Sequence, residues 1–575
     1  MKKYLVTATI LFSNEVLTAA VLREEGDPTK TRFGTSSSAA GSRVVVGAPE
    51  ATGPTSRGAA YFFADALSTT GNLTPGKILT KTDGLASDRF GDSVSIAADT
   101  ALVGAPEHDT SGPATSNQGA AYLYREVSFP VSQVTQTSKL LPASGAAGNE
   151  FGRAVALDPS AQAAVVSAPR LNLIATGINR GVLYTFVNLQ SISAPTVNER
   201  AILYANDGNA GDLLGISAAA WNLNALAGAP GDDTDAVTDH GSAYLWRSFD
   251  QPTGLVNFHV KLTAGDRAAG DEFGRAVALS GNTTLNSTYA LVGAPGDDFG
   301  AVSNQGSAYL FNLGASATGT VTQTAKLVAS TGNAEHVFGS SVAISGQVGL
   351  VGSPANGAPG HAYLFLNLAS ASGTVNETLR LSSPNQLADN AFGASVAIDG
   401  DMIVVGEPAR FLSLDERGRS FTTRVSDLTT VDTAAAVREI DQLLVRSRGS
   451  WIIGQTQDNI TMTLGGAAEM QLVTSGTGIR VGNTHAADNN LLVVLGTVAG
   501  APAVTVGTGS NTGNQLRVNG AVTANAVTVN EGSILSGIGT ISAPVTVTGS
   551  VRPGTTGIGA LTVQGDVTWN AGTAW

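Results

Sequence analysis

The stretch Phe273-Gly-Arg-Ala-Val-Ala-Leu279, followed by Tyr289-Ala-Leu-Val-Gly-Ala-Pro295 and Gly306-Ser-Ala-Tyr-Leu-Phe311, decides how this chain folds. Its first two parts are short apolar runs on either side of a Ser-Gly-Asn turn, which predicts two antiparallel strands. A polar loop at residues 296–300 leads to a third strand, and Ala325-Lys-Leu-Val328 is a fourth. Four strands in meander order are typical of one blade of a β-propeller.

The same pattern occurs seven times along the chain. The Phe-Gly pair, with leucine replacing Phe once, begins at Phe33, Phe90, Phe151, Leu214, Phe273, Phe338 and Phe392. The proline that ends each second strand lies at Pro49, Pro106, Pro169, Pro230, Pro295, Pro354 and Pro408. Five of these seven pairs are sixteen positions apart, and the repeat is about 60 residues long. We therefore predict an all-β fold built on a seven-bladed β-propeller.

The ends of the repeat region predict how the ring closes. Leu22 lies eleven residues before Phe33, the spacing that separates the fourth-strand leucine from the next Phe-Gly pair in the other repeats. Tyr4 lies eighteen residues before Leu22, as the third-strand tyrosines do in most repeats. We therefore expect residues 1–25 to supply strands three and four of a blade whose first two strands lie at 392–408. Such a two-plus-two clasp leaves no edge strand open.

A second interpretation of the N-terminal residues stays open beside the clasp. Met1-Lys2-Lys3 before an apolar run, with Thr18-Ala19-Ala20 behind it, resembles a secretion signal and its cleavage site. If that segment is removed, Phe421, thirteen residues after Pro408, is the alternative third strand.

Composition excludes several classes of function. The formal net charge of −13 argues against a nucleic-acid partner, which requires clustered Lys and Arg. The absence of cysteine excludes disulfides, thiolate metal sites and thiol nucleophiles. No apolar run reaches the eighteen or so residues that span a bilayer, so we do not expect a membrane-spanning protein.

The repeats resemble FG-GAP repeats, the blades of the integrin alpha-subunit head and of many bacterial surface or secreted proteins. The resemblance covers roughly residues 4–421. It implies an extracellular or cell-surface location and a calcium loop between strands one and two of a blade. At that position this chain has Ala98-Asp99-Thr100 or Asp399-Gly400-Asp401, which offer too few oxygens for six to eight ligands. We therefore do not transfer that calcium site.

Acidic residues gather on a different pair of loops. In a four-stranded meander, the loops between strands two and three and the loops from strand four to the next blade lie on the same face. The first set contains the candidate calcium ligands Asp232, Asp233, Asp235, Asp297 and Asp298. The second set includes Asp83, Asp88, Asp207, Asp212, Asp266 and Asp271. This face is the predicted binding face, and the alternative is that the acids cap their own turns.

Three functions are consistent with these residues. We favour a non-enzymatic surface or secreted protein that binds an extracellular protein or glycan, with calcium as the one possible cofactor. The enzymatic alternative is a propeller hydrolase or lyase that pairs Asp232 with Asp297 and uses His240. The third is a purely structural envelope protein.

The pattern changes after the propeller, for which we set the bounds 26–412. In the connector, residues 413–458, Val437, Ile440 and Leu444 form one helical stripe and predict a short helix over 432–446. Short Val-Thr-Val strands recur between glycines in residues 459–575 and predict a stacked solenoid. The run from Gly532 to Val563 resembles the β-helix repeats of bacterial autotransporter passengers.

Overall fold

The fold is described here from a computed structural model of the 575-residue chain. The described residues are 20–22, 32–50, 58–66, 71–83, 87–109, 117–128, 132–172, 180–233, 237–282, 287–300, 302–314, 317–330, 336–355, 358–383, 390–408, 418–425, 437–440, 444–447, 451–453, 461–464, 469–472, 479–481, 491–494, 497–501, 503–507, 513–554 and 560–570.

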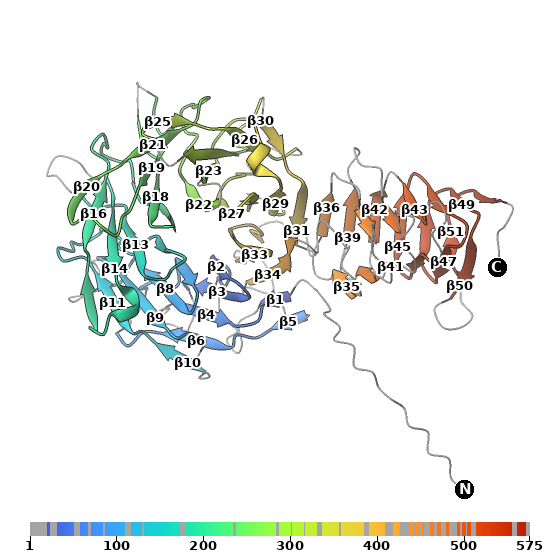
Figure 1. The fold of residues 1–575 in the computed structure, drawn as a ribbon, viewed down its shortest axis with the longest axis horizontal. Coiled ribbons are helices and arrows are strands. Elements are labelled where there is room, and N and C mark those ends of the chain that lie inside the picture. The colour runs from blue at the N-terminus through green and yellow to red at the C-terminus, as the bar shows by residue number, and fades with distance from the viewer. Residues whose placement is uncertain are drawn as a thin grey trace, which may run out of the picture.

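Seven sheets surround a common axis and form a disc (Figure 1). Successive strands of a blade pair antiparallel and run from the axis outward. Blade 1 contains β2 (Ser36–Ala40), β3 (Arg43–Ala48), β4 (Ala59–Phe63) and β6 (Lys77–Thr80). Blade 2 contains β7 (Val94–Ala97), β8 (Thr100–Ala105), β9 (Ala120–Arg125) and β11 (Ser138–Leu141). Blade 3 contains β12 (Val155–Leu157), β13 (Ala163–Ala168), β14 (Val182–Val187) and β16 (Ala201–Tyr204).

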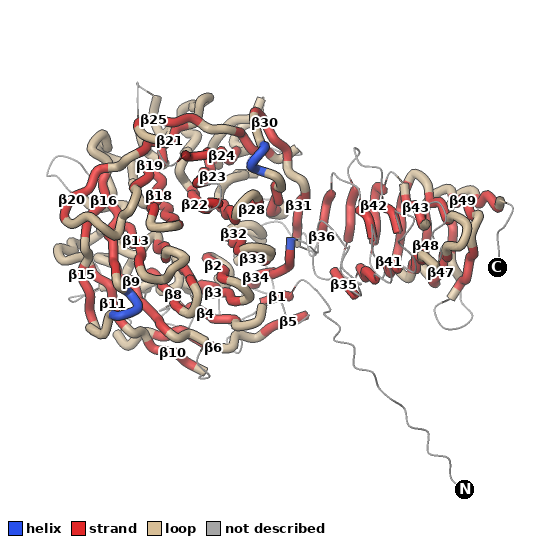
Figure 2. The backbone as a smooth tube through the Cα atoms, in the orientation of Figure 1, coloured by secondary structure: helices blue, strands red, loops and turns tan. Residues whose placement is uncertain are grey.

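The next three blades repeat this arrangement. Blade 4 contains β17 (Ser217–Trp221), β18 (Asn224–Ala229), β19 (Ser242–Trp246) and β21 (Val260–Thr263). Blade 5 contains β22 (Ala276–Asn282), β23 (Ser287–Ala294), β24 (Ser307–Gly314) and β26 (Ala325–Val328). Blade 6 contains β27 (Ser341–Ser345), β28 (Val348–Ser353), β29 (His361–Phe365) and β31 (Leu379–Ser382). Strands dominate the described residues, with short helical turns at η2 (Leu189–Ser191) and η3 (Leu368–Ser370), so the prediction of an all-β, seven-bladed propeller is confirmed (Figure 2).

The seventh blade joins the two ends of the propeller, but not by the predicted two-plus-two clasp. It contains β32 (Ser395–Asp399), β33 (Met402–Glu407), β34 (Arg419–Arg424) and β1 (Ala20–Leu22), so β34 is the third strand and the described N-terminal residues supply the fourth. The third strand is the segment around Phe421, whose ring lies 5.4 Å from that of Phe392. The third-strand Tyr363 packs on Phe338 in the same way, at 5.2 Å. Leu22 is fully buried in the fourth strand, as predicted, whereas Tyr4 lies outside the described residues.

Six blades carry an additional fifth strand that was not predicted from the sequence. The connection between strands three and four of each following blade contributes a short strand that pairs parallel to the fourth strand of the blade before it. These outer strands are β5 (Gly71–Leu73), β10 (Gln133–Thr135), β15 (Thr196–Asn198), β20 (Gly254–Asn257), β25 (Gly319–Thr322) and β30 (Gly373–Asn376). Each fourth strand therefore has partners on both sides, which protects its edge.

Blade 6 obtains its outer partner from the C-terminal part of the chain. The connection that would supply its fifth strand belongs to blade 7. In that blade the third strand, β34, and the fourth strand, β1, come from opposite ends of the propeller. Instead, β36 (Leu444–Ser447) pairs antiparallel with β31. The predicted connector helix over 432–446 is therefore wrong, because β35 (Val437–Ile440) and β36 are strands. Residues 432–436 and 441–443 lie outside the described residues.

From residue 437 onward, the described strands stack in three parallel sheets beside the disc (Figure 1). One sheet contains β35, β38 (Thr461–Leu464), β41 (Leu491–Val494), β44 (Gln515–Val518), β47 (Ile534–Gly537) and β50 (Ser550–Pro553). A second contains β37 (Trp451–Ile453), β40 (Ile479–Val481), β43 (Val504–Val506), β46 (Val527–Val529), β49 (Val545–Val547) and β52 (Val567–Trp569). The third continues blade 6 through β36, β39 (Glu469–Leu472), β42 (Thr497–Ala501), β45 (Ala521–Ala524), β48 (Thr540–Ser542) and β51 (Thr562–Val563). Alternate side chains such as Val527 and Val529 are buried between the sheets.

The Phe-Gly pair packs one blade against the next. Phe90 is buried in a cluster that joins Val45 and Phe62 of blade 1 to Tyr122 of blade 2. Gly91 has a φ of +94°, and a Cβ there would lie 2.2 Å from the carbonyl oxygen of residue 59 in blade 1. Only glycine allows this approach, so each repeat needs the pair for packing.

Candidate functional site

Two sets of loops meet on one face of the propeller, as the meander predicts. We call this the loop face, formed by the loops between strands two and three and the loops from strand four to the next blade. Asp207 follows β16, Asp232 follows β18, and both contact the ammonium of Lys261 on β21. An ion pair therefore joins the two kinds of loop in blade 4.

In blade 4 the lysine lies opposite a third-strand tyrosine. Lys261 and Tyr244 are cross-strand partners, and Lys261 Nζ lies 5.1 Å from the tyrosine ring centroid. Lys261 Nζ donates to Asp207 Oδ2 at 2.9 Å and to Asp232 Oδ2 at 2.8 Å. Ser242 Oγ also donates to Asp232 Oδ2. Burial opposes the charged ammonium, but Asp232 and Asp207 more than offset it, so the pKa of Lys261 lies above its usual value.

Blade 5 repeats this arrangement with different residues. Lys326 is the cross-strand partner of Tyr309, and its Nζ donates to Asp266 Oδ2 at 2.6 Å and to Asp297 Oδ2 at 2.7 Å. Ser307 Oγ donates to Asp297, and Tyr309 OH donates to Asp266 Oδ1 at 3.0 Å. The two blades therefore use the same four kinds of side chain in the same places.

Blade 2 changes one member of the set. His108 occupies the place of Asp232, is 1% exposed, and has its Nδ1 2.9 Å from Asp88 Oδ2. Its Nε2 lies 2.7 Å from Lys139 Nζ, which also donates to Asp83 Oδ2 at 2.6 Å. Since the ammonium can only donate, His108 Nε2 accepts from it and Nδ1 carries the proton that faces Asp88. An additional Lys81 pairs with Asp88.

A further acid lies beneath each of the clusters in blades 4 and 5. Burial raises the pKa of Asp212 to about 7, against a hydrogen bond from the backbone of Asn209, and the charge of Asp232 adds to the increase. Asp271, the equivalent residue in blade 5, has its pKa raised to about 6, again mainly by burial. Within the described part of the chain, Asp212 Oδ1 and Asp232 Oδ1 are buried and have no hydrogen-bond partner.

The candidate calcium ligands do not come together at one point. Asp232 and Asp297 lie in separate blades, each with its own lysine. Asp233 Oδ1 accepts from the backbone of Asp239 at 2.6 Å, and Asp298 Oδ1 accepts from that of Asn304 at 2.8 Å, so both cap their own loops. Asp235 lies outside the described residues.

These contacts fit a metal ion poorly. Calcium takes six to eight oxygen ligands, whereas the inward oxygens of Asp232 and Asp297 already face an ammonium. Among the residues that the structure describes, no group of three or more histidine or acidic side chains is arranged to hold a metal. His240, the proposed partner of the paired acids, is buried with Nδ1 2.8 Å from the carbonyl oxygen of Gly241.

The lysines of these clusters were not predicted from the sequence. Their signal is the residue before the fourth-strand leucine, which pairs across the strands with the third-strand tyrosine. That residue is a lysine at Lys139, Lys261 and Lys326. The cross-strand register, which places each of these lysines beside the third-strand tyrosine, therefore connects a strand residue to the loop acids.

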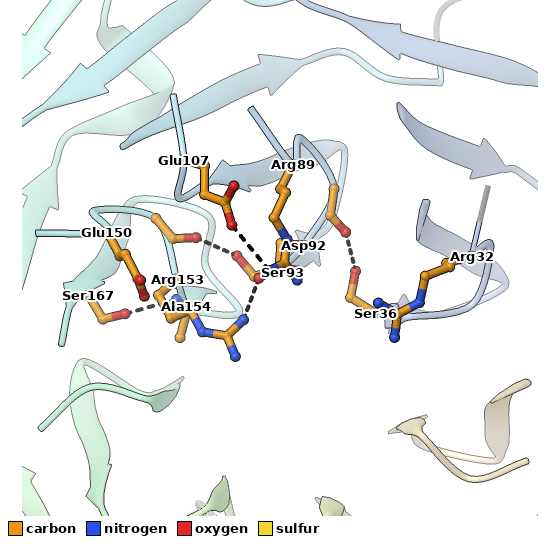
Figure 3. Close-up of polar contacts among 12 residues, drawn as sticks. Arg32, Ser36, Arg89, Asp92, Ser93, Glu107, Glu150, Arg153, Ala154 and Ser167 are labelled. Carbon is orange, nitrogen blue, oxygen red and sulfur yellow. Dashed lines mark hydrogen bonds and ion pairs between the residues drawn. The ribbon is translucent and has the colours of Figure 1, made fainter. Parts of the chain in front are cut away.

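A second network lies on the loop face of blades 1 to 3 and was also missed (Figure 3). Arg89 and Arg153 both pair with the buried carboxylate of Asp92, so blades 2 and 3 are joined through it. Arg89 also reaches Glu107 at 3.3 Å. In blade 1, Arg32 pairs with Glu50 at 3.1 Å. In the sequence, this network is indicated by charged residues at the two positions that flank a Phe-Gly pair, as Arg89 and Asp92 do.

Serines beside the Phe-Gly pairs add hydrogen bonds between neighbouring blades. Ser36 Oγ donates to the carbonyl oxygen of Gly91, and Ser93 Oγ donates to that of Gly152 (Figure 3). Ser395 Oγ makes the same bond to the carbonyl oxygen of Gly34, at 2.9 Å, and so links blade 7 to blade 1.

The axis of the disc contains a cavity of about 430 Å³. Residues of the innermost strand of all seven blades line it, and most are small apolar or hydroxyl side chains such as Ser95 and Ala219. Trp221 is the largest of the lining residues, and Asp399 is the one acidic residue among them. Among the described residues, no helix has the length and apolar character needed to cross a membrane.

Comparisons with known proteins identify the repeats. A family model described as "FG-GAP repeat" matches residues 76–124, 134–186, 197–246, 256–311, 321–365 and 375–418, which together make up about half of the chain. No curated protein matches the chain. Among solved structures, that of Sqt1 from Chaetomium thermophilum is 14% identical, with 72% of this chain and 91% of that one covered and a TM-score of 0.36.

Proposed function

Because the chain belongs to the FG-GAP repeat family, we propose that it is a non-enzymatic binding protein of the cell surface or the extracellular space. Its ligand is an extracellular protein or glycan held on the loop face. In this proposal the parallel strands of the C-terminal part form a β-helix stalk that carries the propeller.

One observation supports this proposal above the others. Buried ion pairs link the loops at the base of the loop face. Acids at the loop tips are exposed, among them Asp233, Asp239, Glu272 and Asp298. A firm base with exposed tips holds binding groups in place at little entropic cost. Since the tips are acidic, we expect the ligand to present basic groups and the affinity to fall with salt.

The enzymatic alternative has less support. Paired-acid catalysis needs two carboxylates that converge on one substrate. Asp232 and Asp297 instead face Lys261 and Lys326 in different blades. Calcium at the five candidate ligands stays a prediction, and the lysine contacts argue against it for Asp232 and Asp297.

A binding screen tests the proposed function. Purified full-length protein is applied to arrays of glycans and matrix proteins, and any ligand found is measured again with a variant that carries Asp233→Asn, Asp239→Asn, Glu272→Gln and Asp298→Asn. We expect at least a tenfold loss of affinity, with a weaker salt dependence. The matched control, Asp65→Asn with Glu126→Gln, removes exposed acids from the opposite face and should bind normally. Equal losses in both variants would refute the assignment of this face.

A further inference from the structure

Three blades share one arrangement, which we call the lysine cluster. In each, a fourth-strand lysine reaches one group on the loop that enters the blade and one on the loop between strands two and three. The members are Asp83, His108 and Lys139 in blade 2, Asp207, Asp232 and Lys261 in blade 4, and Asp266, Asp297 and Lys326 in blade 5.

The lysine in each cluster has the position and contacts of a bound cation. Lys261 is 6% exposed and Asp232 is fully buried, so water contributes little to neutralising the carboxylate. The ammonium donates to two carboxylates from different loops at 2.8 and 2.9 Å. A buried carboxylate without a counter-charge is strongly unfavourable, so the lysine decides whether these two loops can lie together.

Blade 3 shows what happens where the lysine is missing. Ile202 takes the place of Lys261 and is the cross-strand partner of Tyr184. At the positions equivalent to Asp207, Asp212 and Asp232, blade 3 has Ser144, Asn149 and Leu171. The cation and all three acids are therefore replaced together by neutral residues.

Blade 2 balances its charges in another way. His108 replaces the second carboxylate, and Lys81 is added beside Asp88, so two lysines face two aspartates. Blade 6 is outside the pattern, with Arg380 at the place of the lysine and, in sequence, Asn356 at that of Asp232.

From these contacts we propose that the ammonium groups of Lys139, Lys261 and Lys326 are built-in cations of the loop face. They hold the loops of blades 2, 4 and 5 together as a bound metal ion would, and the face is therefore ordered without calcium. This goes beyond the proposed function, because it concerns how the face is held and not what the face binds.

The proposal implies an uncompensated charge once the lysine is removed. Without Lys261, Asp207 and Asp232 lose the ammonium that both contact, and Asp232 is fully buried. A buried carboxylate without a counter-charge is strongly unfavourable. Removal of the ammonium is therefore expected to destabilise blade 4 unless Asp232 is neutralised as well.

The test compares melting temperatures of full-length variants in excess calcium chloride and in excess EDTA. We expect the wild-type melting temperature to be the same in both. Lys261→Met should melt several degrees lower than the wild type in both solutions. Adding Asp232→Asn to Lys261→Met should restore part of the loss, because it removes the uncompensated buried charge. The matched control is Lys77→Met, whose ammonium donates to the carbonyl oxygen of Val127 in another blade, and adding Asp232→Asn to it should restore nothing.

Two results would overturn the proposal. One is a wild-type protein stabilised by calcium in a way that Asp232→Asn removes, because then a metal and not the lysine holds the loops. The other is a Lys261→Met variant that melts like the wild type, or one that Asp232→Asn does not restore. If Lys261→Met does not fold, Lys261→Gln and Lys326→Gln provide the same comparison, and a calorimetric calcium titration of the wild type with and without Asp232→Asn decides the first outcome alone.

Discussion

Asp212 lies at the base of blade 4, where its Oδ2 accepts a hydrogen bond from the backbone N–H of Asn209 at 2.6 Å. Its pKa in the folded protein is about 7, against an ordinary value of 3.8, mainly because of burial. At a pH between these two pKa values, the folded state therefore keeps a proton on Asp212 that the unfolded state has released. The free energy of unfolding should fall as the pH rises from about 4 to about 7, since a raised carboxyl pKa favours folding only on the acidic side.

The variant Asp212→Asn tests this expectation because it cannot titrate. A plot of melting temperature against pH should be flatter for Asp212→Asn than for the wild type between pH 4 and 7, with the difference in stability greatest near neutral pH. Asp233→Asn is the control, since Asp233 is exposed. Parallel curves for the wild type and Asp212→Asn would show that Asp212 titrates normally.

Single residues also show what the sequence could and could not predict. The loop face and its acids follow from repeat spacing and meander parity, which are visible in the sequence. The role of Asp232 does not, because its partner Lys261 lies in a strand and meets it only through cross-strand register. Asp233 and Asp298 look like the same motif in sequence, yet they cap loops, because adjacent residues of a tight loop point in different directions.

At the scale of elements, the three-residue strand β1 closes the ring. It pairs antiparallel with β34 and parallel with β5, and Leu22 is buried in a cluster with Phe33, Tyr61 and Val404 from blades 1 and 7. Leu22→Ala should therefore cost about 2–5 kcal/mol, as for other buried leucines. The loss should be accompanied by faster hydrogen exchange in β34 and β5, because both depend on β1.

The control for Leu22→Ala is Leu255→Ala on β20, where the side chain is 59% exposed. It should leave the calorimetric transition unchanged. If Leu22→Ala lowered stability without affecting exchange in β34 and β5, closure by β1 would not be the reason.

The two wrong element predictions have physical causes. The spacing of Tyr4 fits a third strand, but Phe421 fits too, and only the three-dimensional contact with Phe392 separates them. The stripe in residues 437–444 fits a helix, but β31 has an unpaired edge at this point, and pairing with that edge outweighs local preference. Hydrophobic periodicity depends only on the residues of one segment. It therefore cannot show that a strand elsewhere in the fold has an unpaired edge.

At the scale of the whole molecule, the same seam that closes the propeller also explains where the C-terminal part attaches. Six fourth strands are covered by a strand from the next blade, and β31 of blade 6 is the one that blade 7 cannot cover. The attachment of the stacked sheets through β36 is therefore a consequence of ring closure, since an open β edge is a template for another strand.

This explanation predicts the effect of one proline. Val445 pairs with Leu381 of β31, and β36 lies between β31 and β39 in the sheet. Val445→Pro removes a backbone donor from an interior strand and should release β36 from blade 6. Hydrogen exchange in β31 should then accelerate strongly, while β26, which β30 covers, stays protected. Val445→Ala keeps the donor and should resemble the wild type. Because the released edge can pair with a second molecule, Val445→Pro should also self-associate in light scattering, and a protected β31 in a monomeric variant would contradict the explanation.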